Sequence, residues 1–148
     1  MKKVFSTILI SSLLICAMVF PTNAAQQIHP KIDTIYTEFG PVEIKSTLVV
    51  YDSFRSNKKS ADLTREVRYN GKTIAEVTLS ATFGYDGKTA WVISASGSHT
   101  TYDGWSYNSE KISKSGGTAT LTASLFKLSA GTIPISFSMT CSPTGQIS

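Results

Sequence analysis

The sequence has few residues of the kinds that hold metals or cross-link small domains. It contains two histidines and two cysteines, and Cys16 lies in the apolar N-terminal stretch. Without that stretch only Cys141 remains, which excludes an intrachain disulfide. We expect Cys141 to be buried as a small apolar side chain, with a covalent dimer or a nucleophilic thiol as the alternatives. The chain has no histidine pair at ligand spacing, no calcium-loop pattern and no phosphate-binding glycine loop, so we expect no metal and no cofactor.

A strong charge imbalance is also missing. The formal charge is +4, and it falls to +2 if Lys2 and Lys3 are removed with the N-terminal stretch. Such a mildly basic chain gives no reason to expect a nucleic-acid partner. The one basic cluster, Arg55, Lys58 and Lys59, lies in a Ser/Asn-rich stretch, which we interpret as a solvated loop.

The only long apolar run lies at the N-terminus and resembles a secretory signal peptide. Two lysines precede the run, and small residues follow Pro21, with cleavage after Ala24 or Ala25. A retained membrane anchor and lipidation at Cys16 are the alternatives. The prediction is a signal peptide over 1–24, a flexible leader over 25–32 and one domain over 33–148. The mature chain is then secreted and extracellular and has no membrane span.

No stretch shows sustained helical spacing, whereas apolar and polar side chains alternate repeatedly. The clearest alternation runs over 75–83, and others lie at 42–50, 63–67, 119–125 and 133–139. One sheet cannot bury its apolar face alone. We therefore predict an all-β domain, an antiparallel meander closed into a two-layer β-sandwich, with a small β-barrel as the alternative. Pro134 predicts an edge strand or the start of a strand.

One short turn motif occurs three times, as Tyr-Asn-Gly at 69–71 and Tyr-Asp-Gly at 85–87 and 102–104. Asx-Gly between alternating runs is a strong hairpin signal. A two-residue loop at 70–71 would set the apolar face of the second strand beside polar residues of the first. We therefore predict a three-residue loop with Gly71 left-handed in a bulge, which sets Leu63 opposite Val77.

The same rule fixes the register at the other two turns. It pairs Ala81 with Trp91 and Leu79 with Ile93, which places both partners from the second strand in the core. At the third turn it sets His99 opposite Tyr107. Trp91 is therefore expected to be a core residue and not a ligand contact.

Four aromatic residues near the turns are the candidate ligand contacts: Tyr85, Tyr102, Trp105 and Tyr107. Exposed rings on a rigid β scaffold can stack on sugars or anchor a protein partner. Their alternative role is structural, because such residues also close the ends of a core or pair across strands.

His99 is the histidine with polar neighbours, which include Asp103 and several serines. Catalytic triads depend on three-dimensional geometry, and neither a nucleophile elbow nor a papain-like cysteine context is present. We therefore predict no catalytic residue. A small secreted hydrolase that uses His99 or Cys141 remains the alternative.

Two segments carry a resemblance to a family. They read Ala-Thr-Phe-Gly-Tyr-Asp-Gly-Lys-Thr-Ala at 81–90 and Met-Thr-Cys-Ser-Pro-Thr-Gly-Gln-Ile-Ser at 139–148, and they resemble a loose group of small secreted β-rich proteins of Gram-positive bacteria. Members of that group often carry another cysteine just after the mid-chain turn, which could pair with the one in the tail. Here 91–93 reads Trp-Val-Ile, so Cys141 lacks that partner. The resemblance implies secretion and a β fold, and no particular activity.

These observations predict a secreted binding protein. Its expected ligand is a cell-envelope polysaccharide or a protein, contacted through the turn aromatics. The alternatives are the hydrolase and a toxin-like or antimicrobial protein. The oligomeric state stays open.

Overall fold

The computed structural model describes residues 25–37, 40–52 and 56–148. The signal peptide expected over 1–24 and Arg55 of the basic cluster lie outside the described residues. The regular structure of the described part is all β-strand. The strands are β1 (Ala25–Thr37), β2 (Gly40–Asp52), β3 (Lys58–Tyr69), β4 (Lys72–Tyr85), β5 (Ala90–Thr101), β6 (Ser106–Ser115), β7 (Thr118–Lys127) and β8 (Gly131–Thr140).

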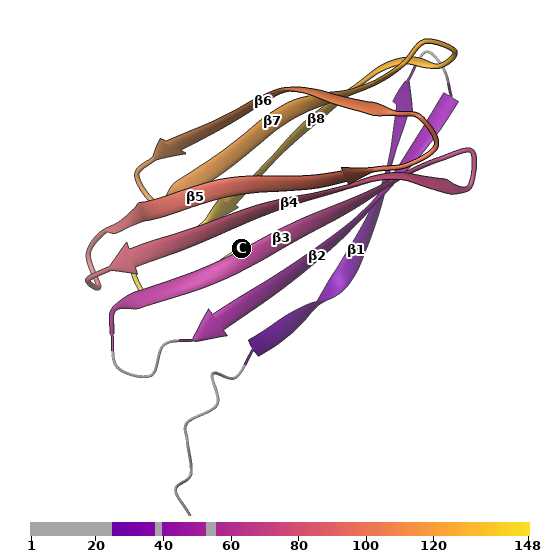
Figure 1. Ribbon diagram of the computed structural model, residues 1–148. Helices are drawn as coiled ribbons and strands as arrows, with labels where there is room; N and C mark the ends of the chain where they lie inside the picture. The colour runs from indigo at the N-terminus through magenta and orange to yellow at the C-terminus, as the bar shows by residue number, and fades with distance from the viewer. Residues whose placement is uncertain (1–24, 38–39, 53–55) are drawn as a thin grey trace, which may run out of the picture.

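The strands form two antiparallel sheets that face each other (Figure 1). The larger sheet has the order β1-β2-β3-β4-β5 and the smaller one the order β6-β7-β8, and the chain crosses between them after β5. The predicted two-layer β-sandwich is confirmed. The barrel alternative is wrong, because no described strand of one sheet pairs with a strand of the other. Within these described ranges, no helix has the length and apolar character needed to cross a membrane.

The segment 25–32, expected to be a leader outside the domain, is instead the first part of β1. Its pairing with β2 begins with Ala25 opposite Tyr51, and a bulge interrupts it between Ile28 and Lys31. Pro30 lies in this bulge. Because β1 is an edge strand, the missing N–H of the proline is tolerated there.

The core lies between the sheets and combines the alternating apolar residues of both. Its largest fully buried side chains include Leu79 and Phe83 of the larger sheet and Leu121, Leu125, Ile133 and Met139 of the smaller one. Cys141 is 3% exposed and has no disulfide partner, so its predicted burial is confirmed. Pro134 lies in β8, an edge strand, also as predicted.

The β3–β4 turn corrects the predicted three-residue loop. Tyr69 pairs with Lys72, so the loop has two residues, and Asn70 and Gly71 adopt φ of 48° and 74°. Two left-handed residues match the twist of the flanking strands better than the predicted turn does. A bulge then inserts Ile74 into β4 and restores the apolar register, so Leu63 lies opposite Leu79 and not Val77.

The β4–β5 loop corrects the second register. Tyr85 pairs with Ala90, which leaves a four-residue loop, and a bulge between Thr82 and Phe83 shifts the later pairs. Ala81 therefore lies opposite Ala95 instead of Trp91, and Leu79 lies opposite Gly97 instead of Ile93. The predicted burial of Trp91 and Ile93 is wrong, because the two side chains are 44% and 40% exposed.

The third motif connects two sheets rather than two paired strands. The backbone N–H of Trp105 donates to the carbonyl oxygen of Tyr102 over 3.1 Å, and the chain then enters β6 in the smaller sheet. The predicted strand pairing of His99 with Tyr107 is wrong, because β5 and β6 belong to different sheets and His99 pairs with Val77 of β4. The two rings nevertheless stack on each other. The ring centroids are 3.8 Å apart with an interplanar angle of 18°.

Candidate ligand-binding surfaces

The four predicted aromatic contacts do not form one surface. Strand β4 runs from the turn at 70–71 to the loop at 86–89, so Tyr85 and Tyr102 lie at opposite ends of the sandwich. The backbone N–H of Tyr102 donates to the carbonyl of Ile74, which places Tyr102 beside the β3–β4 turn. Tyr102 is 40% exposed and is the one member of the set that the structure leaves open to solvent to this degree.

Packing within the domain occupies the other three aromatics. Trp105 is only 5% exposed and packs edge-on against Tyr69, with ring centroids 5.8 Å apart. The solvent exposure expected of Trp105 is therefore wrong. Tyr85 is half-buried, and a Cβ at Gly145 would lie 2.5 Å from Cζ of its ring, so the C-terminal tail covers it.

Tyr107 forms a closed contact at the side of the sandwich where β5 and β6 meet. Its ring stacks on His99, and its hydroxyl donates to Oε2 of Glu110 over 2.7 Å. Burial, followed by the hydrogen bond and charge of Glu110, raises the pKa of Tyr107 well above its ordinary value. The arrangement holds the two sheets together and leaves little of the Tyr107 ring for a ligand.

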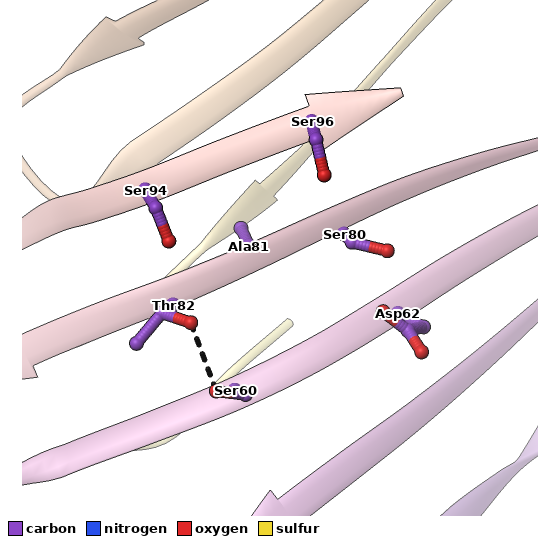
Figure 2. A pocket seen from close by; sticks show the side chains of 7 residues that line it. All are labelled: Ser60, Asp62, Ser80, Ala81, Thr82, Ser94 and Ser96. Carbon is purple, nitrogen blue, oxygen red and sulfur yellow. Dashed lines mark hydrogen bonds between the residues drawn. The ribbon is translucent and has the colours of Figure 1, made fainter. Parts of the chain in front are cut away.

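The outer face of the larger sheet carries a hydroxyl-rich hollow of about 170 Å³. Its lining comes from β3, β4 and β5, and Figure 2 shows these side chains projecting from neighbouring strands. The lining residues are Ser60, Asp62, Ser80, Ala81, Thr82, Ser94 and Ser96. Strand pairing places the polar ones in two rows across the strands, one through Ser60, Thr82 and Ser94 and the next through Asp62, Ser80 and Ser96.

Internal hydrogen bonds fix part of this lining. The hydroxyls of Ser60 and Thr82 are 2.9 Å apart and hydrogen-bonded (Figure 2). On the neighbouring strand β2, the Tyr51 hydroxyl donates to Oδ2 of Asp62 over 3.2 Å, and this bond raises the pKa of Tyr51. Tyr51 is 37% exposed and therefore forms an aromatic border on the β2 side of the hollow.

Trp91 lies on the same outer face, in the β4–β5 pair next to the hollow. It pairs with Gly84, two residues along β4 from Thr82. A Cβ at Gly84 would lie 2.4, 2.5 and 2.6 Å from Cε2, Cζ2 and Nε1 of the indole. Near-equal distances to three ring atoms mean that one face of the indole covers the glycine. The opposite face accounts for the exposed fraction of Trp91.

The residues of the hydrolase alternative occupy structural positions. The Cys141 thiol is buried in the core, and burial raises its pKa, although the positive charge of Lys59 opposes this. His99 is committed to the stack with Tyr107. The buried Cys141 thiol is therefore neither activated nor accessible as a nucleophile, and one face of the exposed His99 ring is covered by Tyr107.

A metal site does not emerge either. In the described ranges, no three His, Cys, Asp or Glu side chains come close enough together to hold a metal ion.

The hydroxyl-rich outer face was not predicted from the sequence, although two signals for it are present. Serine and threonine occupy alternate positions over 78–82 and 94–98, which is typical of one face of a sheet. Gly84 inside a strand indicates a close approach by another group. Neither signal identifies Trp91 as that group, because the bulge that turns Trp91 outward has no clear sequence mark.

Comparison of the chain with protein-family models, with curated proteins and with solved structures finds no match.

Proposed function

We propose that this protein is a secreted carbohydrate-binding protein whose ligand lies on the outer face of the β1–β5 sheet. The observation that carries the proposal is the Trp91 indole lying flat on Gly84 beside a hollow lined with hydroxyls and one carboxylate. The indole offers an apolar plane, and the hollow offers directional polar groups. A pyranose ring needs both.

The chemistry of the lining fits a sugar better than an apolar ligand. A serine or threonine hydroxyl both donates and accepts hydrogen bonds, as a sugar hydroxyl does. The Asp62 carboxylate accepts from a sugar hydroxyl in a charge-assisted bond, which is stronger than a neutral one. The C–H face of the ring packs against the indole and removes apolar area from water.

The form of the hollow supports binding rather than hydrolysis. Glycoside hydrolysis generally requires two carboxyl groups on opposite sides of the bond that breaks. Asp62 is the one carboxylate among the residues that line the hollow. The hollow is also small beside ordinary ligand pockets of about 300–1,000 Å³. A polymer that lies along the sheet and places one ring at a time over the hollow suits this size.

Location outside the cell is supported by the sequence. The charged start, apolar run and small-residue site of 1–24 are typical of a signal peptide. The resemblance of 81–90 and 139–148 to secreted β-rich proteins points the same way. A cell-envelope polysaccharide is then the ligand that the protein would meet first.

The test is co-sedimentation of the mature protein with insoluble cellulose, chitin and purified cell-wall polysaccharide. We expect Trp91→Ala to weaken retention on at least one of them by about 2 kcal/mol, or about thirtyfold, as the loss of a central aromatic contact usually does. Asp62→Asn should weaken the same interaction. Tyr36→Ala is the matched control, because Tyr36 is an 86% exposed tyrosine on β1 away from the hollow.

A Tyr102→Ala variant separates this proposal from the turn-aromatic hypothesis. If Tyr102→Ala abolishes retention and Trp91→Ala does not, the ligand binds at the turns and the outer-face proposal is wrong. If whole envelopes retain the protein through Trp91 while every purified polysaccharide fails to, the ligand is a protein.

A further inference from the structure

The three copies of the turn motif use their polar side chains differently. In the β4–β5 loop, Oδ1 of Asp86 accepts from the backbone N–H of Lys88 over 2.9 Å and from that of Thr89 over 2.6 Å. These bonds close the loop and lower the pKa of Asp86. The Asp86 carboxylate is therefore occupied by its own backbone.

The two motif copies at the other end close without such bonds. Asn70 and Gly71 have φ of 48° and 74°, and Asp103 and Gly104 have φ of 53° and 74°. Left-handed residues at both positions make each turn without a hydrogen bond from the Asn70 or Asp103 side chain. Among the described residues, none forms a side-chain hydrogen bond or ion pair with the Asn70 amide or the Asp103 carboxylate.

These two turns border a hollow of about 240 Å³ at that end of the sandwich. Its floor is apolar, with Ile74 2% and Trp105 5% exposed. Lys72 and Lys127 line it together with Asn70 and Asp103. The hollow therefore has an apolar floor and a rim with two ammonium groups and one carboxylate.

The rim is partly preorganised. Nζ of Lys127 donates to the backbone carbonyl of Asp103 over 2.7 Å, which ties β7 to the β5–β6 turn. This bond leaves two further N–H groups on the same ammonium. No described residue forms an ion pair with Lys72 or with Asp103. A ligand that carries charges of both signs would pair with all three groups, the ammonium groups of Lys72 and Lys127 and the carboxylate of Asp103.

We propose that this hollow, the turn-end site, binds a small zwitterion of amino-acid size. The ligand carboxylate lies between Lys72 and Lys127, its ammonium group faces Asp103, and a short apolar side chain faces Ile74 and Trp105. The volume is below that of ordinary drug-sized pockets, which favours a small ligand. The site does not depend on the outer-face proposal, since it lies at the end of the sheet and shares no lining residue with the other hollow.

The two tryptophans provide the readout. The chain contains only Trp91 and Trp105, so a nitrogen–proton correlation spectrum has two indole N–H signals, and Trp91→Ala assigns them. The probes are L-alanine as the zwitterion, acetate as the anion alone and methylammonium as the cation alone. We expect alanine to shift the Trp105 indole signal and the Gly71 and Gly104 amide signals, and to leave the Trp91 signal in place.

Matched variants make the test specific. Lys72→Ala should weaken alanine binding about tenfold, which is the effect of losing one charge-assisted bond. Lys88→Ala is its control, since Lys88 holds the same motif position at the opposite end. Asp103→Asn should weaken alanine more than acetate, and asparagine keeps the left-handed turn.

Three results would overturn the proposal. Alanine that leaves the Trp105 and turn signals unmoved excludes the site. Acetate that binds as tightly as alanine shows a simple anion site. Equal effects of Lys72→Ala and Lys88→Ala show that the lysine at 72 has no special role.

Discussion

Replacing Gly84 with alanine tests whether the Trp91 indole lies flat on Gly84, which is the geometry on which the outer-face proposal depends. The added Cβ would lie 2.4 Å from the Trp91 indole, so the ring must lift from the sheet. Trp91 is 44% exposed, so about half of its surface is covered now. Lifting the ring exposes roughly 100 Å² of an aromatic side chain, which costs about 2.5 kcal/mol at about 25 cal/mol per Å². Alanine is more favourable than glycine within a strand by about 0.5–1 kcal/mol, and this gain offsets part of the cost.

We therefore expect Gly84→Ala to lower the free energy of unfolding by about 1.5–2 kcal/mol. The assay is urea unfolding followed by far-ultraviolet circular dichroism, which does not depend on tryptophan emission. In a Trp91→Ala background the clash is gone, and Gly84→Ala should then stabilise the protein by about 0.5–1 kcal/mol. An equal effect in both backgrounds, a coupling near zero in this double-mutant cycle, would refute the stacked geometry.

Three further predictions concern titratable groups. The pKa of Tyr107 is raised, so its contribution to stability is complete below pH of about 10 and decreases as the pH rises above that value. Tyr107→Phe should make the alkaline decline of the urea midpoint shallower, and an unchanged decline would contradict the burial of this hydroxyl. The pKa of Asp86 is lowered, so its contribution is present above the ordinary value of 3.8 and lost as the pH falls below it; Asp86→Asn should therefore reduce the acid dependence of thermal unfolding. Cys141 is buried with a raised pKa, so a thiol reagent should label it slowly in native protein and rapidly in urea, and rapid native labelling would place the thiol at the surface.

The fold class could be predicted from the sequence because it depends on local alternation. The stripe from Ala75 to Phe83 has one buried face whatever its partners are, and one such face requires a second layer. The edge position of Pro134 follows from its missing N–H in the same local way. Both predictions hold.

The register could not be predicted, because it depends on where the chain places its extra residues. Parity correctly required odd positions to pair with odd ones between β3 and β4. A three-residue loop and a two-residue loop followed by a bulge satisfy that rule equally well, and the second solution occurs at Ile74. Sequence patterns do not show which of two residues a bulge will insert.

The exposure of the candidate aromatics could not be predicted for the same reason. The bulge between Thr82 and Phe83 separates Trp91 from the core stripe and turns its indole outward. Trp105 was expected at the surface but is buried, because its turn joins two sheets and directs the ring into the space between them. Of the four predicted aromatics, only Tyr102 is exposed as expected. Tyr85 and Tyr107 are half-buried, and Trp105 is buried.

The most direct test of the outer-face proposal is a titration of the isotopically labelled mature protein with cellohexaose and with chitohexaose, which reads the two indole N–H signals. Binding on the outer face predicts that at least one of these sugars shifts the Trp91 signal and the amide signals of Ser80, Thr82 and Ser94, while the Trp105 signal stays unchanged. A shift confined to Trp105 and Tyr102, or an unmoved Trp91 signal with a polysaccharide that retains the protein, would contradict it.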